Sequence, residues 1–399
     1  MVKFAAALII VARKLNFPMI YRFTVSRSQS TIILGLLLFA LTLTSAAVAQ
    51  SERSQHAISL KAQYGVDVNS DNPNRKDNYL YGLHISYDKN VAHSNKEWVH
   101  ILNAKGLSFG LTWHNLDNMK ETVDGVAYAG GQAFGALAEV DVQLLQLGRA
   151  RLLVTPGIGL AYITENIFTQ PATSTIGSHL NLMLTGELSL EVPVSQGSSI
   201  LVGGHIQHYS NGGVVVPNGG WNMLTGSLGL KTALGNTGAQ TDGQAEEYGH
   251  IEGNSAELWF GAGVRGRYRD RHGKFFRSGM YAGYNFYMNR AISLKAGSHV
   301  TYYHTVFDPE RFDETFQYYG SSLDPVRWGV AAGADVTMGP IVINAMYGKY
   351  LHYRNYHNVK WYWVTGVRYY FTPNIGVQST LHLHGVQADY ANWGLILRI

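Results

Sequence analysis

Apolar and polar residues alternate with a period of two along most of the chain after residue 50. From Leu180 to Val192, every second residue is apolar or glycine, and most of the residues between them are polar. The segment from Ile200 to Ser210 repeats this pattern. Successive side chains of a β-strand point to opposite faces, so the alternation predicts strands of about ten residues with one apolar face. Amphipathic helical spacing is hard to find, and we expect an all-β fold.

The connections between these segments alternate in length. Short turns are expected at residues 146–148, 193–197, 288–290, 338–340 and 372–374, and longer loops at residues 164–178, 211–220 and 305–327. Short periplasmic turns and long external loops are typical of a transmembrane β-barrel. The connection from Asp88 to Lys105 departs from this pattern, because it is too long for a short turn.

The first fifty residues have the pattern of an export signal. Arg22 and Arg27 precede an apolar run at residues 31–44, and small residues follow up to Ala49. This order is typical of a secretory signal peptide, with cleavage expected after Ala49. The apolar run is shorter than the roughly 20 residues of a spanning helix, and the rest of the sequence contains no run of that length. We therefore predict residues 1–49 to be a signal peptide and do not expect a helical inner-membrane protein.

Composition narrows the class of protein. Only 15% of the residues are charged, well below the roughly 25% of ordinary soluble domains, while the chain has 25 Tyr and 44 Gly. The absence of Cys excludes disulfides, thiolate zinc sites and thiol catalysis. A net charge of +4 without long runs of one sign gives no reason to expect a nucleic-acid partner. The histidines lack ligand spacing with carboxylates, so no metal and no cofactor are expected.

An exported, aromatic-rich chain of alternating strands matches a transmembrane β-barrel of the outer membrane of a Gram-negative bacterium. Lipid offers the backbone no hydrogen bonds, so such a sheet must close on itself. A soluble secreted β-sandwich would show similar alternation and is the alternative fold.

The chain divides into two halves. About eight strands are expected before Leu234 and about eight after Ser255. Residues 235–254 between them are rich in Gly, Gln and Glu, as in a linker. Residues 181–210 and 359–385 resemble each other, which suggests a duplication. We therefore predict two tandem eight-stranded barrels at residues 50–234 and 255–399, with a single sixteen-stranded barrel as the alternative.

One segment combines residues suited to catalysis. His208 and Ser210 lie two residues apart at the end of an expected strand, so both project from one face and the imidazole can act as a general base toward the hydroxyl. That face continues the apolar row of Val202 and Ile206. Asn222 lies on an apolar row of the next strand. A polar trio on a lipid-facing surface suits a substrate that is itself a membrane lipid.

Ester cleavage by a serine also needs a donor for the oxyanion. Asn211 and the flexible backbone of Gly212 and Gly213 follow Ser210 directly and can supply it. The sequence therefore predicts His208, Ser210 and Asn222 as catalytic residues, with Asn211 and Gly212 at the oxyanion.

The run His208-Tyr209-Ser210-Asn211, followed by Pro217-Asn218 and the opening of a strand, resembles the active-site signature of the outer-membrane lipid A 3-O-deacylases, the PagL-like acyloxyacyl hydrolase family. The resemblance is strong over about fifteen residues and extends over residues 51–234. It implies an eight-stranded barrel that removes the 3-linked hydroxyacyl chain from lipid A, so that lipopolysaccharide is the substrate. It also implies Ser210 as nucleophile, His208 as base and Asn211 as oxyanion stabiliser.

The sequence departs from this family at Asn222, which occupies the position of the family's acid. An asparagine can accept a hydrogen bond from the imidazole and hold its tautomer, but it cannot stabilise the imidazolium by charge. Glu187 and Glu191 cannot replace the acid, because alternation places both on the lumen face. We expect weaker activity or a different substrate.

The second half is not expected to carry a site of its own. His382 and His384 share a polar row that points to the lumen, and Val386 stands where a serine would follow His384. The alternative function for the whole protein is a non-enzymatic barrel, either a narrow channel or a surface-interaction protein. A channel would place its polar functional residues in the lumen.

Overall fold

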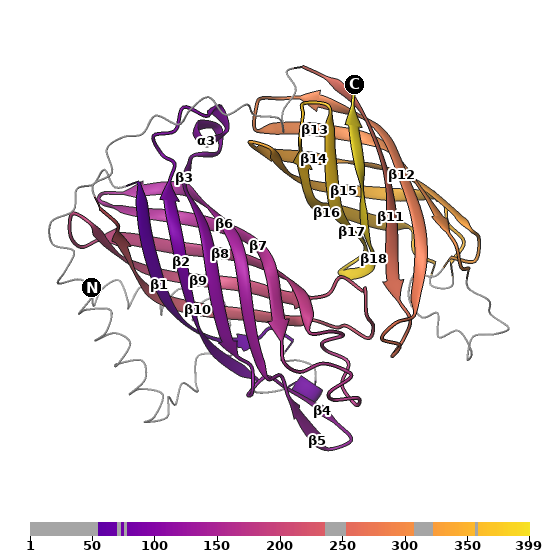
Figure 1. Cartoon of the computed structure of the whole chain (residues 1–399), viewed down its shortest axis with the longest axis horizontal. Helices are drawn as coiled ribbons and strands as arrows, with labels where there is room; N and C mark the ends of the chain where they lie inside the picture. Colours follow the sequence, from indigo (N-terminus) through magenta and orange to yellow (C-terminus); the bar gives the residue numbers. More distant parts are fainter. Residues whose placement is uncertain (1–54, 70–72, 76–77, 236–252, 307–321, 356–357) are drawn as a thin grey trace, which may run out of the picture. The chain divides into compact units, whose positions relative to one another are not determined.

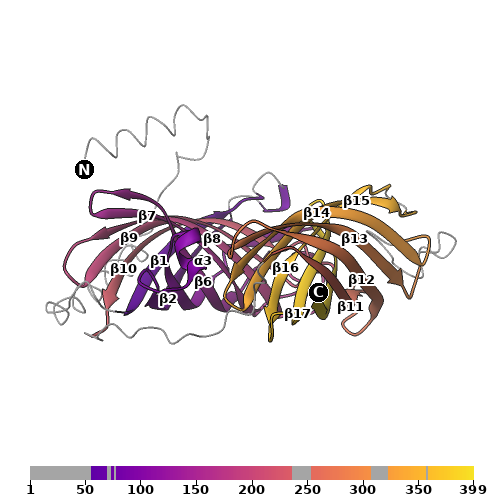
Figure 2. The same cartoon turned by 90° about the horizontal axis from the view of Figure 1, so that it is seen from above.

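The computed structural model describes residues 55–69, 73–75, 78–235, 253–306, 322–355 and 358–399. Within them the chain forms two closed antiparallel barrels of eight strands each (Figure 1). Figure 2 shows the same two groups of strands from another side, β1 to β10 in one and β11 to β18 in the other. The predicted pair of eight-stranded barrels is confirmed, and the alternatives of one sixteen-stranded barrel and a β-sandwich are wrong. The predicted signal peptide and most of the predicted linker lie outside the described residues.

The first barrel runs up and down in chain order. Its strands are β1 (His56–Asp67), β2 (Tyr79–Asn90), β3 (Ala104–Asn115), β6 (Gln132–Leu147), β7 (Ala150–Ile163), β8 (Leu180–Pro193), β9 (Ser198–Ser210) and β10 (Trp221–Ala233). Each strand pairs with the next, and β10 pairs with β1 from Ala233 opposite Ala57 to Met223 opposite Asp67. This last pairing closes the sheet, so no strand edge is exposed.

The second barrel has the same order. Its strands are β11 (Ser255–Gly266), β12 (Lys274–Tyr287), β13 (Ile292–Tyr303), β14 (Val326–Met338), β15 (Ile341–His352), β16 (Trp361–Tyr370), β17 (Ile375–His384) and β18 (Gln387–Arg398). The pairing of β11 with β18, from Glu257 opposite Arg398 to Val264 opposite Ala391, closes it.

The period-two pattern separates the outer surface from the lumen, as predicted. In β9, Val202 and Ile206 are 49% and 64% exposed, whereas the intervening His205 is only 4% exposed. Large apolar side chains such as Phe109 and Leu395 are likewise exposed on the outside of the two barrels. Two continuous apolar surfaces of this kind would be unfavourable in water, but they match the hydrocarbon of a bilayer.

Each lumen is occupied by paired polar side chains rather than left open. In the first barrel, Lys61 pairs with Glu187, and Arg151 Nη2 lies 2.7 Å from Glu191 Oε1. In the second barrel, the fully buried Glu257 lies 3.0 Å from a guanidinium nitrogen of Arg368. Buried charges are tolerated when they are paired and hydrogen-bonded, and such networks hold the barrel wall in one arrangement.

The short connections fall where the sequence predicts them, and the long loops lie together at the opposite end of each barrel. Residues 307–321 of the predicted loop 305–327 lie outside the described residues. The long connection after β2 contains the short helix α3 (Glu97–Leu102), whose Trp98 and Val99 are buried against Val91 and Ala104. The loop after β1 contains the short η2 (Pro73–Arg75). Neither of these described helices has the length and hydropathy needed to cross a membrane.

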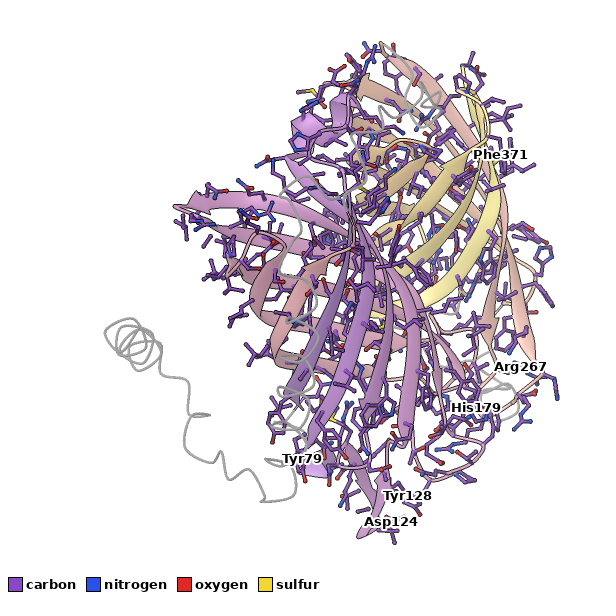
Figure 3. The ribbon with its side chains drawn as sticks, turned by 60° about the vertical axis from the view of Figure 1, so that its left-hand side comes forward. Tyr79, Asp124, Tyr128, His179, Arg267 and Phe371 are labelled. Atoms are coloured by element: carbon purple, nitrogen blue, oxygen red, sulfur yellow. The ribbon has the colours of Figure 1, made fainter. Side chains whose placement is uncertain are left out.

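One element of the loop end was not predicted. The connection between β3 and β6 forms a small hairpin of β4 (Lys120–Val123) and β5 (Val126–Ala129), a sheet separate from the barrel wall. Figure 3 shows its Asp124 and Tyr128 at the same end of the first barrel as Tyr79 and His179. The long loops of this barrel and the β4–β5 hairpin are therefore neighbours.

Candidate active site

The predicted catalytic residues lie where β9 ends and β10 begins, at the loop end of the first barrel. In the register of this pair, His208 is opposite Asn222, and Tyr209 is opposite Trp221. Tyr209 and Trp221 are buried in the interior, so their neighbours His208 and Asn222 point outward. Ser210 shares the row of His208, which places all three side chains on the outer face, as the alternation predicts.

His208 and Asn222 form a direct hydrogen bond across the strand pair. His208 Nδ1 lies 2.7 Å from Asn222 Oδ1. An amide oxygen can only accept, so Nδ1 donates the proton, and Nε2 is the unprotonated nitrogen of the neutral ring. Nε2 makes no hydrogen bond to any residue that the structure describes. The imidazole is therefore oriented at one nitrogen and available as a base at the other.

Ser210 is held by the loop rather than by the histidine. Its Oγ accepts a hydrogen bond of 3.1 Å from the backbone N–H of Gly212. Among the described residues there is no bond between Ser210 Oγ and His208. Catalytic hydrogen bonds are often long or absent in the free enzyme and form when substrate binds, so this geometry is compatible with a nucleophile and base two residues apart.

Gly220 lies against both of these side chains. A Cβ built at Gly220 would be 2.8 Å from His208 Cε1 and 3.4 Å from Ser210 Cβ. Its φ of +75° is also one that residues with a side chain rarely adopt. Both the space and the backbone therefore require glycine here, and the position of Gly220 limits where His208 and Ser210 can lie.

The amide group of Asn211 is used within its own loop. Its Nδ2 donates to Ser178 Oγ at 3.1 Å and to the carbonyl of Val215 at 3.0 Å, and its Oδ1 accepts the N–H of Gly213 at 3.0 Å. Both amide hydrogens therefore have partners within the loop, and the oxyanion role of the Asn211 side chain stays a prediction. Its observed contacts give Asn211 a role in holding the loop, whereas the other predicted donor, the N–H of Gly212, points at Ser210.

The loop 211–220 rests on the loop between β7 and β8. The carbonyls of Ser174 and Thr175 accept the N–H groups of Gly219 and Gly220 at 3.0 and 2.7 Å. Asn218 Oδ1 accepts the N–H of Gly177 at 3.1 Å, while its Nδ2 has no partner among the described residues. The sequence analysis assigned no role to Asn218, although the pair Pro217-Asn218 after Ser210 is part of the signature that resembles the family.

No carboxylate takes the place that Asn222 occupies. Glu187 and Glu191 are 2% and 3% exposed and lie in the lumen, as predicted. There they pair with Lys61 and Arg151 on the side of the wall opposite to His208. Within the described residues, the partner of His208 is an uncharged amide.

His382 and His384 of the second barrel point inward, as predicted. His382 is 1% exposed and stacks on Tyr390 with a ring distance of 4.4 Å, and His384 Nε2 lies 2.8 Å from the hydroxyl of Tyr350. Trp393 and Leu395 of the facing strand point outward. In the part of the chain that the structure describes, no group of three or more His, Asp or Glu side chains is arranged to hold a metal ion.

The two closed barrels with apolar outer surfaces define an outer-membrane barrel protein, and the family comparisons identify its class. Residues 81–231 match the family model described as lipid A 3-O-deacylase (PagL). Residues 254–399 match the model described as acyloxyacyl hydrolase, C-terminal domain. The two matches together cover about three quarters of the 399 residues. The chain belongs to the PagL family of lipid A deacylases. This family is one of ester hydrolases, which favours the enzyme over the alternative of a non-enzymatic barrel.

The match of the second half gives it a family description of its own. We predicted only a weak, degenerate repeat of the first half, and the comparison identifies residues 254–399 as a domain associated with acyloxyacyl hydrolases. The origin of the two halves by duplication stays a prediction.

Several solved structures are similar to parts of this chain. The outer membrane enzyme PagL has 20% identity, with 44% of this chain and 99% of that chain covered and a TM-score of 0.28. Neisserial surface protein A has 11% identity, with 45% and 98% covered and a TM-score of 0.28. A designed transmembrane β-barrel has 12% identity, with 37% and 98% covered and a TM-score of 0.24. The comparison with curated proteins gave no match.

Proposed function

We propose that this lipid A deacylase removes the 3-O-linked hydroxyacyl chain by nucleophilic attack of Ser210, with His208 as the general base. One observation carries the proposal: His208, oriented by Asn222 at 2.7 Å, shares the apolar outer face with Ser210. A lipid substrate in the bilayer reaches that face directly, whereas it has no access to a residue in the packed lumen.

The reaction has two steps. Ser210 Oγ forms a bond to the ester carbonyl carbon while His208 Nε2 takes the hydroxyl proton. The tetrahedral intermediate collapses, the bond to the sugar oxygen breaks, and His208 returns the proton to that oxygen. In the second step His208 activates a water molecule, which attacks the acyl-enzyme and releases the hydroxy fatty acid.

The oxyanion requires hydrogen-bond donors near Ser210. The N–H of Gly212, already 3.1 Å from Ser210 Oγ, is the first donor in this proposal. Asn218 is the second, because its oxygen is fixed by Gly177 and its Nδ2 is free of described partners. The hydrogen bonds of Asn211 to Val215 and Gly213 support a role for Asn211 in holding this loop, and with it both donors, in place.

The fatty acid at the 3-position is assigned from the family alone, and mass spectrometry of lipid A tests it. Lipid A from cells that produce the protein should lack one hydroxyacyl chain, and released hydroxy fatty acid should appear. Ser210→Ala and His208→Ala should each reduce the rate by several powers of ten while leaving heat-modifiable folding intact. Deacylation at the wild-type rate by Ser210→Ala would remove this residue from the mechanism.

A further inference from the structure

Glu121 is a buried carboxylate at the loop end of the first barrel that the proposed mechanism does not use. It lies on β4, in the small hairpin whose turn residue Asp124 and β5 residue Tyr128 are labelled in Figure 3. It is 8% exposed. No cationic side chain among the described residues forms an ion pair with it. A carboxylate buried without a cation is stable only if several hydrogen bonds satisfy it.

Two adjacent residues of the β7–β8 loop provide those bonds. The backbone N–H and Oγ of Ser174 donate to Glu121 Oε1 at 3.1 and 2.7 Å. The N–H of Thr175 donates to Oε2 at 3.1 Å, and Thr175 Oγ1 donates to the same oxygen. Four donors on one carboxylate fix this stretch of the loop strongly, because hydrogen bonds to a charged acceptor are stronger than neutral ones.

The same two residues hold the catalytic loop with their carbonyl groups. Ser174 accepts the N–H of Gly219, and Thr175 accepts the N–H of Gly220. Gly220 in turn lies against His208 and Ser210. An unbroken series of short contacts therefore runs from Glu121 through residues 174–175 and 219–220 to the proposed base and nucleophile.

We propose that Glu121 is a positioning residue for the deacylation reaction, acting through Ser174 and Thr175 on the placement of Gly220. This inference rests on the proposed roles of Ser210 and His208. Without the carboxylate, the four donors of Ser174 and Thr175 lose the acceptor that they share. The loop at residues 174–175 is then less firmly held, and so is Gly220, which is bonded to it. Displacements of about 1 Å at a reacting group cost on the order of a hundredfold in rate.

The test compares Glu121→Gln and Glu121→Ala with the wild type, using full-length protein in detergent micelles with purified lipid A. We expect kcat to fall about tenfold for the glutamine, which keeps the shape but has only one acceptor atom, and about a hundredfold for the alanine. KM should change less than threefold, because the hydrogen bonds of Glu121 go to Ser174 and Thr175 and not to Ser210 or His208. Labelling of Ser210 by a small fluorophosphonate should slow in the same order, since it requires the aligned nucleophile but no lipid.

Glu165→Gln is the matched control. Glu165 belongs to the same β7–β8 loop and accepts bonds from Thr169 and Gln170, but it makes no hydrogen bond with residues 174–175. We expect its kcat and labelling rate to stay within about twofold of the wild type. All variants should keep heat-modifiable folding, which shows that the barrel is closed.

The outcomes separate this inference from the proposed function. If Ser210→Ala is inactive while Glu121→Ala keeps kcat and labelling rate within twofold of the wild type, the positioning role is wrong and the proposed function stands. An equal loss in Glu165→Gln, or a rise in KM with kcat unchanged, would also overturn the positioning role. If Ser210→Ala deacylates at the wild-type rate, the proposed function itself fails.

Discussion

At the scale of single residues, Asn222 decides how far the first barrel can act as a deacylase. Its amide oxygen accepts the Nδ1 proton of His208 at 2.7 Å, so the ring is oriented as a base needs. The same oxygen carries no full charge and cannot stabilise the imidazolium that forms during attack. Orientation and charge stabilisation, which one carboxylate usually supplies together, are therefore separated at this position.

Substitution of Asn222 measures the two contributions separately. Asn222→Ala should reduce kcat about ten- to a hundredfold, because it removes a hydrogen bond worth about 1.5–3 kcal/mol to a ring that becomes charged. Asn222→Asp keeps the size and adds the charge, so kcat should rise above that of the wild type by about tenfold. Steady-state release of hydroxy fatty acid gives both values. An aspartate variant slower than the wild type, with heat-modifiable folding intact, would contradict the assigned role of His208.

At the scale of the element, the β9–β10 pair shows which parts of the site the sequence can predict. The period of two places His208, Ser210 and Asn222 on one outer face, because strand geometry leaves only two directions for a side chain. The loop between the strands follows no such rule. Its bonds run to Ser174, Thr175 and Gly177, about forty residues earlier in the chain, and onward to Glu121. A sequence pattern limited to neighbours does not reveal partners at that distance.

Asn211 illustrates the same limit within the loop. Its position directly after Ser210 suggested a donor to the oxyanion, but sequence proximity does not show which atoms its amide bonds. The structure engages both amide hydrogens with Ser178 and Val215. Side-chain amides hydrogen-bond readily to nearby backbone groups in turns, and the amide of Asn211 makes such local bonds here.

Gly220→Ala tests how closely this loop fixes the site. The added Cβ would approach His208 Cε1 to 2.8 Å, and the positive φ adds backbone strain of about 1 kcal/mol or more. We expect kcat to fall at least tenfold, with fluorophosphonate labelling of Ser210 reduced in parallel. Gly219→Ala is the control, because a Cβ at the exposed Gly219 has no neighbour closer than 3.7 Å. Equal activity of the two variants would show that the loop adapts and that Gly220 does not limit the site.

At the scale of the whole molecule, the chain repeats a closed barrel, but His382 and His384 of the second barrel do not repeat the outward position of His208 in the first. Both halves close through the pairing of first and last strands, and both fill their lumens with paired charges. The number of barrels followed from the sequence because a linker-like stretch separates two equal sets of strands. The ion pairs in the lumen of the second barrel did not follow from the sequence. Glu257 pairs both with Lys295 on a nearby strand and with Arg368, which lies more than a hundred residues later in the chain.

The second barrel should contribute no deacylation of its own. His382 and His384 face the lumen and bond or stack with tyrosines, and the residue two positions after His384 is Val386. A base at His382 or His384 would have no access to lipid. Ser278 and His304, whose Oγ and Nε2 lie 2.9 Å apart on the exposed side of the second barrel, are not at the positions of Ser210 and His208 in the repeat. In the full-length protein, His384→Ala should therefore keep kcat within about twofold of the wild type, since the aromatic neighbours of His384 remain to support the fold. Ser210→Ala should leave only background release of hydroxy fatty acid, and adding His384→Ala to it should change nothing. Residual activity in Ser210→Ala that His384→Ala then removes would place a second active site in residues 255–399.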